Sequence, residues 1–280
     1  YSEKKQFEYK KIDIDIPFDD SKLFIQKFID SINSKTKVIF LSHITSSTAL
    51  IFPVKEICKI AKENNILTII DGAHVPGHIK LDIRDIDPDI YVGACHKWMC
   101  SPKGVSFLYV NKNYQKNIEP LVISWGWKDK SFSKESEFIN WHQWQGTNDL
   151  SSYLTIPVIL DFFKKNNWNK VSLDCKKLIL ETKNHFHDLN SKCIPTSNNS
   201  KHLGQMLSFK VNQDSNLIKV LKNDFTKIPE IQKIIFNQSK IYMPIIIWND
   251  EIFMRVSIQA YNSKKDIESM FIMLDHFNLL

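Results

Sequence analysis

The stretch that decides the fold class is "ILTIIDGAHVPGHIKLDIRDIDPDIYVGACHKWMCSPKGVSFLYV", residues 66–110. It holds three short apolar runs, "ILTIID", "DIYVGA" and "VSFLYV", each of the length and composition of a buried strand. Ahead of it, "KVIFLS" (37–42) reads as another strand and "PVKEICKIAKENN" (53–65) as a helix. Apolar strands separated by helices predict an α/β fold with three layers, α/β/α, in which a mostly parallel sheet is covered on both faces.

Two side chains stand at one edge of this predicted sheet. Asp71 ends one strand and Lys97 follows another, and such sheets bind ligands beyond the carboxyl ends of their strands. Pyridoxal phosphate requires this pair, because a lysine forms a Schiff base with its aldehyde and an acid pairs with its pyridinium nitrogen. An apolar setting beside Trp98 and Met99 would lower the pKa of Lys97, as this chemistry needs. Spacing alone leaves open that both are solvated loop residues.

Patterns outside this stretch outline the rest of the first part of the chain. "KIDIDIPF" (11–18) reads as a strand, and "SKLFIQKFIDSI" (21–32) reads as an amphipathic helix. Residues 112–149, rich in Trp, Ser, Lys and Gly, read as an irregular segment around the site. "SSYLTIPVILDFFKK" (151–165) then resumes a helix. We predict a large domain over residues 1–167.

The pattern changes from about residue 168 onward. Helices alternate there with strands such as "MLSFKV" (206–211), and two late strands read as a hairpin that turns at Asn249-Asp250. A last helix follows Ser263, which can cap it. We predict a smaller α+β domain over residues 168–280.

Composition excludes several classes of function. The formal net charge is +6, but the basic residues are scattered, so we expect no nucleic-acid partner. The apolar runs are too short to span a bilayer, so we expect no membrane segment. Five cysteines without metal-binding spacing predict free thiols, no metal and a cytoplasmic protein.

Three groups of residues resemble one known family. "DGAHVPGHIKLDI…DPDIYVGACHKWMCSPKGVSFLYV", "WQGTND" before "SSYLTIPVILDF", and "RVSIQAYNSKKDIESM" occur in the same order in class V aminotransferases. These are fold-type I pyridoxal phosphate enzymes, and the chain is most similar to their isopenicillin N epimerase-like branch. The resemblance extends from about Ile12 onward. It implies pyridoxal 5'-phosphate as cofactor and an amino acid as substrate.

The resemblance implies roles for several residues of the predicted large domain. Lys97 is then the Schiff-base lysine, Asp71 the partner of the pyridine nitrogen, and His74 a contact of the cofactor phenolic oxygen. His96 matches a position that contacts the phosphate or packs in the core, and a satisfied buried histidine is an equal alternative. Ser46, with Ser47 beside it, lies where the family holds a polar residue near the ring oxygen or the substrate, although a hydroxyl-rich turn is the alternative.

Further roles concern the substrate and a second subunit. Gly146 and Thr147 match a pair that reaches the cofactor phosphate of the neighbouring subunit, which implies a homodimer with shared active sites. Arg255 matches the arginine that grips the substrate carboxylate through two parallel hydrogen bonds.

The chain also departs from the family pattern. Lys97 lies early in the sequence, and no glycine-containing phosphate loop precedes the first strand, so we expect an N-terminally truncated chain. Ala94 stands where relatives often have a polar residue near the phosphate, and Ala49 stands where glycine is common.

The function that these resemblances imply is chemistry at the α-carbon of an amino acid, by epimerisation or β-elimination. Cysteine desulfuration is an alternative, for which Cys193 is the loop candidate as nucleophile. A second alternative is an inactive remnant of a longer enzyme.

Overall fold

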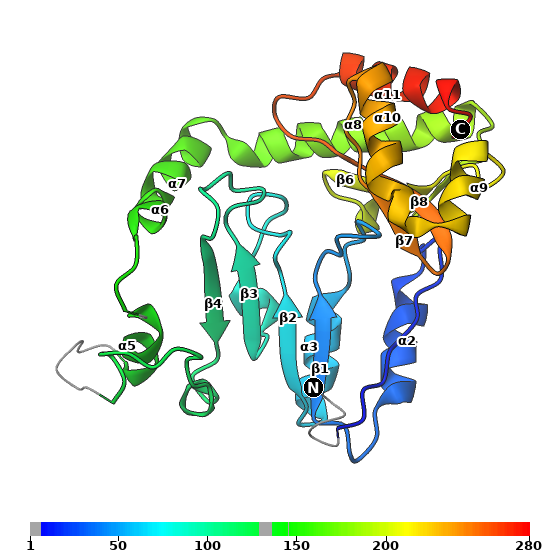
Figure 1. Cartoon of the computed structure of the whole chain (residues 1–280). Coiled ribbons are helices and arrows are strands. Elements are labelled where there is room, and N and C mark those ends of the chain that lie inside the picture. Colours follow the sequence, from blue (N-terminus) through cyan, green and yellow to red (C-terminus); the bar gives the residue numbers. More distant parts are fainter. Residues whose placement is uncertain (1–6, 129–135, 145) are drawn as a thin grey trace.

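A computed structural model describes residues 7–128, 136–144 and 146–280, and two four-stranded sheets organise them (Figure 1). The first sheet has the order β1-β2-β3-β4. Its strands are β1 (Val38–Ser42), β2 (Leu67–Asp71), β3 (Ile90–Ala94) and β4 (Ser106–Val110). The first three are parallel, and β4 is antiparallel to β3. The predicted α/β fold with a mostly parallel sheet is confirmed.

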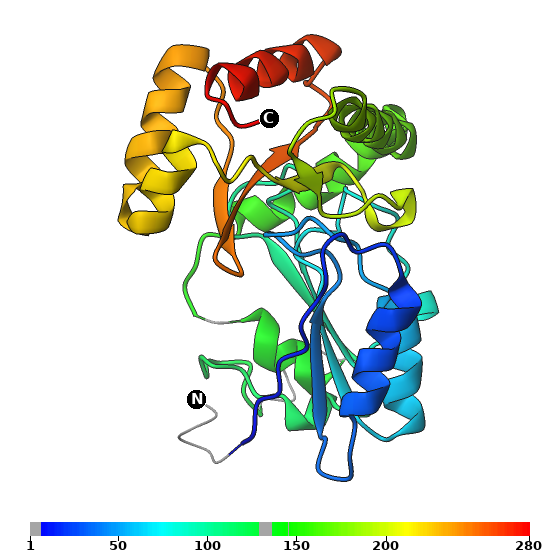
Figure 2. The same cartoon turned by 90° about the vertical axis from the view of Figure 1, so that its right-hand side faces the viewer.

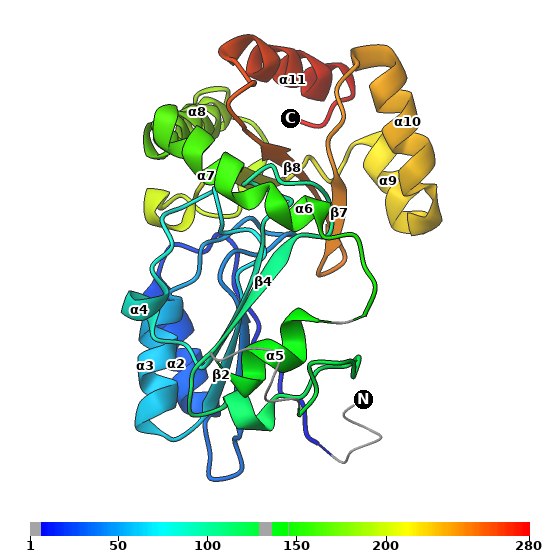
Figure 3. The same ribbon diagram turned by 90° about the vertical axis from the view of Figure 1, so that its left-hand side faces the viewer.

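Helices α2 (Ser21–Ser31) and α3 (Val54–Glu63) form where they were predicted, whereas the short helix α4 (Ile83–Ile86) was not predicted. All three lie on one face of this sheet, as Figures 2 and 3 show. Phe24 and Phe28 of α2 pack into the core beneath this face. On the opposite face, the described residues leave the outward side chains partly uncovered. They include Val38, Val92, Leu108 and Phe40, which is 58% exposed.

Two predictions in the first part of the chain were wrong in detail. Residues 11–18 form no strand: they run along the core, but no strand among the described residues lies beside them to accept a ladder of hydrogen bonds. The helix predicted over 151–165 is two helices, α6 (Ser151–Leu154) and α7 (Ile156–Lys165). Pro157 has no N–H to continue the first of them.

Between β4 and α6 the chain is mostly irregular, as expected. A 3₁₀ turn, η1 (Gln115–Asn117), and the short helix α5 (Glu137–Gln143) are its regular elements among the described residues. Helix α5 lies on the side of the first sheet opposite α2 and α3 (Figure 3).

The second sheet has the order β5-β6-β8-β7 and is antiparallel throughout. Its strands are β5 (Ile194–Pro195), β6 (Met206–Lys210), β7 (Ile245–Trp248) and β8 (Glu251–Ser257). The predicted hairpin is confirmed: Asn249 and Asp250 join β7 to β8 with φ of 49° and 59°, the left-handed pair of a type I′ turn.

Four α-helices and two 3₁₀ turns complete this part. They are α8 (Trp168–Asp188), η2 (Ser200–His202), α9 (Asn216–Asn223), η3 (Phe225–Lys227), α10 (Ile228–Ser239) and α11 (Lys264–His276). Ser263 caps α11 as predicted, in a capping box with Asp266. Helix α10 was not predicted, although it buries Ile231 and Ile235.

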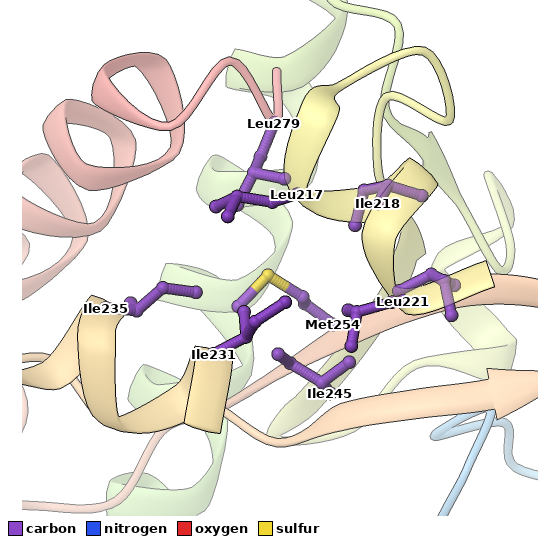
Figure 4. Close-up of a pocket in the computed structure, with 9 residues that line it drawn as sticks. Leu217, Ile218, Leu221, Ile231, Ile235, Ile245, Met254 and Leu279 are labelled. Atoms are coloured by element: carbon purple, nitrogen blue, oxygen red, sulfur yellow. The ribbon is translucent and has the colours of Figure 1, made fainter. Parts of the chain in front are cut away.

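The second sheet buries a separate apolar core. Side chains from α9, α10, β7, β8 and Leu279 meet around an apolar cavity of about 10 Å³ (Figure 4). No polar atom lines this gap, so it offers no partner for a water molecule. The predicted boundary between residues 167 and 168 falls between α7 and α8 and stays a prediction. Of the helices in the described ranges, none is long and apolar enough to cross a membrane.

Candidate active site

The parallel strands of the first sheet all point their carboxyl ends at the second sheet (Figure 1). The chain segments that follow β1, β2 and β3 therefore meet β6 and β8 there. This edge brings together Ser46, Asp71, His74, Lys97 and Arg255, five of the residues singled out in the sequence.

Asp71 is the last residue of β2 and is held in place by two hydrogen bonds. Its Oδ1 accepts from the backbone N–H of Ala73 at 2.9 Å, and its Oδ2 accepts from Ser42 Oγ at 3.3 Å. Ser42 ends the neighbouring strand β1, in register with Asp71. A carboxylate has about four lone-pair sites, so it can accept a further hydrogen bond.

A buried pair lies close to Asp71 and was missed in the sequence. His43 Nδ1 lies 3.0 Å from Tyr91 Oη, and burial lowers the pKa of His43 to about 4. Burial, and then the negative charge of Asp71, raise the pKa of Tyr91. Gly72 must lack a side chain here, because a Cβ would lie 2.1 Å from Tyr91 Oη. Neither His43 nor Tyr91 stood out in the sequence, because Tyr91 lies within the apolar strand β3 and His43 directly follows β1 without a recognisable motif.

His74 and Lys97 are in direct contact: His74 Nε2 lies 3.2 Å from Lys97 Nζ. The pKa of His74 is lowered to about 4: burial is the largest cause, Lys97 and Arg255 act in the same direction, and Asp71 opposes them. Partial burial is also the largest cause of the lowered pKa of Lys97; Asp71 opposes it and Arg255 supports it. The amine therefore loses its proton more readily than an ordinary lysine.

The two apolar neighbours of Lys97 are more deeply buried than the lysine itself. Trp98 and Met99 are buried, whereas Lys97 is exposed and reaches towards His74. Trp98 instead lies behind His74, with its Nε1 3.3 Å from His74 Nδ1. Its ring also packs on His78, with ring centroids 4.2 Å apart.

Arg255, on β8, links the second sheet to the segment after β1. Its Nη1 donates to the backbone oxygen of Ser46 at 2.6 Å and to Ser46 Oγ at 2.9 Å. Burial lowers the pKa of Arg255, and its buried Nε has no hydrogen-bond partner among the described residues. The structure thus brings Ser46, rather than Ser47, into contact with a predicted site residue.

Other predicted residues lie outside this group. His96 Nδ1 donates a hydrogen bond to the backbone oxygen of Val105 at 3.1 Å, and its predicted contact with the cofactor phosphate stays a prediction. Gly146, with φ of 101°, and Thr147 lie in the segment between α5 and α6, which Figure 1 shows on the β4 side of the first sheet. Their predicted contact with a second subunit stays a prediction.

The structure also places three further residues: Cys193 and Ala49, which the sequence singled out, and Cys100. Cys193 is buried, and burial raises the pKa of its thiol to about 11, so it is not an exposed nucleophile. Cys100 is exposed. Ala49 has φ of 58°, in the left-handed region that favours the glycine common in relatives.

The donor set fits the ring of the cofactor that the sequence implies. A carboxylate with acceptor capacity, a neutral histidine and a lysine with a lowered pKa meet at one edge. The buried Nε of Arg255, for which the described part of the chain supplies no hydrogen-bond partner, adds a charged group able to hold an anion. In the part of the chain that the structure describes, no three His, Cys, Asp or Glu residues gather as a metal site.

Comparison with known proteins identifies the family. The family model described as aminotransferase class-V matches residues 5–270. Isopenicillin N epimerase of Amycolatopsis lactamdurans is 25% identical over 244 residues, which cover 84% of this chain and 58% of that protein. L-cysteine desulfhydrase of Arabidopsis thaliana is 28% identical over 55% of this chain and 34% of its own length. The chain thus spans less than two thirds of these relatives.

A solved structure supports the fold. The apo structure of a cysteine desulfurase from Thermococcus onnurineus NA1 matches with a TM-score of 0.78 and covers 99% of this chain and 68% of that one. At 18% identity this likeness shows a shared fold alone.

Proposed function

The chain belongs to the class V aminotransferase family, and we propose that it is part of a pyridoxal phosphate-dependent enzyme acting at the α-carbon of an amino acid. The observation that carries the proposal is the contact of Lys97 Nζ with His74 Nε2 at 3.2 Å, at the strand edge that also holds Asp71. The reaction we favour is epimerisation, as in the isopenicillin N epimerases that the chain resembles.

Each residue of the site has a role in this proposal. Bound pyridoxal phosphate supplies an electron sink for the bonds of the α-carbon. Lys97 Nζ is the amine that attaches to the cofactor, and Asp71 holds the pyridine nitrogen in its protonated form. His74 lies beside Lys97 and provides a hydrogen bond to the ring oxygen.

Lys97 has a second role as the group that moves the proton. An amine with a lowered pKa is neutral in a larger fraction of molecules near pH 7, so it can accept the proton of the substrate α-carbon. Lys97 keeps the proton it accepts, and a second group that delivers its own proton to the opposite face would invert the α-carbon.

Arg255 fixes the substrate in the proposed site. Ser46 holds Nη1 of the guanidinium, and this anchor orients the remaining N–H groups for a carboxylate. A carboxylate held at one point sets the position of the α-carbon relative to Lys97.

The proposed enzyme is a homodimer. Gly146 and Thr147 lie between α5 and α6, and they offer a backbone N–H and a hydroxyl suited to a phosphate. We assign both to the cofactor phosphate in a neighbouring subunit.

β-Elimination is the second candidate, and the L-cysteine desulfhydrases among the relatives favour it. That reaction converts L-cysteine and water to pyruvate, hydrogen sulfide and ammonia, and the same removal of the α-proton starts it. Desulfuration through a cysteine nucleophile has less support, because Cys193 is buried.

One experiment separates these reactions. The chain with added pyridoxal phosphate is incubated in D₂O with single amino acids, and deuterium at the α-carbon is followed by NMR beside sulfide release. Exchange with inversion and without sulfide supports epimerisation, and sulfide with pyruvate supports elimination. No exchange with any amino acid, under conditions in which the cofactor is bound, would contradict the proposed activity and favour an inactive remnant.

A further inference from the structure

Trp98 follows Lys97 in the sequence, but its indole is directed at His74 rather than at the amine. Its Nε1 lies 3.3 Å from His74 Nδ1, on the side of the imidazole opposite Lys97. The side chain is buried, so this hydrogen bond is shielded from water.

The hydrogen-bonding roles in this chain of contacts follow from the chemistry of each group. An indole N–H only donates, so His74 Nδ1 must accept and carries no proton. A neutral His74 then has its proton on Nε2, which lies 3.2 Å from Lys97 Nζ. An ammonium has no lone pair to accept this N–H, whereas a neutral amine has one.

We propose that Trp98 is a positioning residue that fixes the His74 tautomer and thereby holds Lys97 as a neutral amine. The importance of that amine for catalysis rests on the proposed function, but the tautomer and the state of Lys97 do not. In the opposite tautomer, the Nδ1–H of His74 would face the indole N–H, and Nε2 would accept from a charged Lys97. Trp98 therefore selects between the two states.

A second layer of contacts holds Trp98 and His74 in this arrangement. His78 packs against the indole ring. Its Nδ1 lies 2.9 Å from the backbone oxygen of His74, and its Nε2 accepts a hydrogen bond from the backbone N–H of Gln205 at 2.6 Å. Gln205 precedes β6, so the second sheet supports His78, against which the tryptophan ring packs.

The charged groups around His74 and Lys97 shift the pKa values of these two residues in opposite directions. Asp71 favours a charged His74 and a charged Lys97, whereas Arg255 disfavours both charges. His78 is kept neutral by burial, and the nearby Lys176 acts in the same direction. Asp71 favours the charged form of Lys97, whereas burial favours the neutral amine. A hydrogen bond donated by His74 Nε2 also favours the neutral amine and so adds to the effect of burial.

The test measures the reactivity of Lys97 in the chain without cofactor. Acetylation by acetic anhydride is followed across a pH series by peptide mass spectrometry, because only the neutral amine reacts. Trp98→Phe keeps an aromatic ring on His78 but lacks the N–H donor. We expect the midpoint of Lys97 acetylation to rise by about one pH unit in this variant, the size of one net hydrogen bond.

The matched control is Trp168→Phe, which also loses an indole N–H, bonded at 3.0 Å to the backbone oxygen of Gly77. We expect the Lys97 midpoint to stay in place in this control. An unchanged midpoint in Trp98→Phe, or equal shifts in both variants, would overturn the proposal. Because no cofactor is present, a failure to bind pyridoxal phosphate leaves this result unaffected.

A second measurement needs no variant and covers the case in which Trp98→Phe does not fold. The ¹⁵N chemical shifts of the histidine rings distinguish a protonated from an unprotonated Nδ1. We expect His74 to show an unprotonated Nδ1 and a protonated Nε2 at neutral pH. A protonated Nδ1 would overturn the proposal.

Discussion

Arg255 and Ser46 connect the two sheets at the candidate active site. Arg255 Nη1 lies 2.6 Å from the backbone oxygen of Ser46 and 2.9 Å from its Oγ, so one residue offers two acceptors to one guanidinium nitrogen. The segment after β1 and strand β8 are thereby fixed relative to each other. A substrate carboxylate bound by Arg255 would be positioned by the same hydrogen bonds between Arg255 and Ser46.

Replacing Ser46 tests this connection. Ser46→Ala removes the hydroxyl acceptor and keeps the carbonyl, so we expect the free energy of unfolding to fall by about 0.5–1.5 kcal/mol. Urea denaturation measures the loss. The matched control is Ser47→Ala, the exposed neighbour, which we expect to change little. Equal losses in both variants would contradict a specific role for Ser46.

Much of this site could be predicted from the sequence because parallel strands end at one edge. Asp71 and Lys97 follow strands with clear apolar patterns, and the fold alone brings them to the same side. Arg255 needed the family resemblance, because a strand position gives no information on which distant loop it will meet.

The remaining features depend on contacts that no local pattern encodes. Whether Ser46 or Ser47 meets Arg255 depends on the path of one turn, and the direction of the Trp98 indole depends on the packing of His78 beneath it. Residues 11–18 have the alternation of a strand, but no strand within residues 7–128, 136–144 and 146–280 lies beside them, and a sequence does not show this.

The buried His43 predicts a dependence of stability on pH. Burial lowers its pKa from 6.5 to about 4, so the unfolded chain takes up a proton that the folded chain refuses between these values. The free energy of unfolding therefore falls as the pH falls through this window. We expect His43→Gln to reduce the slope of the free energy of unfolding against pH by at most about 1.4 kcal/mol per pH unit.

Urea denaturation of both chains at several pH values between 6.5 and 4 measures this slope. His74 and His78 have lowered pKa values from burial as well and contribute to both chains alike, so the difference isolates His43. An identical slope in the two chains would show that His43 takes up its proton in the folded state.

The cysteines predict an order of thiol reactivity. Cys193 is buried, its thiol lies 3.1 Å from the backbone oxygen of Leu279, and burial raises its pKa to about 11. Cys100 is exposed. We expect iodoacetamide at neutral pH to modify Cys100 first and Cys193 only after denaturation, as read by peptide mapping. Rapid labelling of Cys193 in the folded chain would instead support desulfuration through that thiol.

The most direct test of the central claim is a visible absorption spectrum of the chain with pyridoxal phosphate, beside Lys97→Ala and Lys103→Ala. Lys103 is an exposed lysine in the same connection after β3 and serves as the matched control. The account predicts the band of a lysine-bound cofactor in the parent and in Lys103→Ala, and its loss in Lys97→Ala. A band of equal strength in all three chains, or no band in the parent, would contradict the assignment of Lys97 as the amine that holds the cofactor.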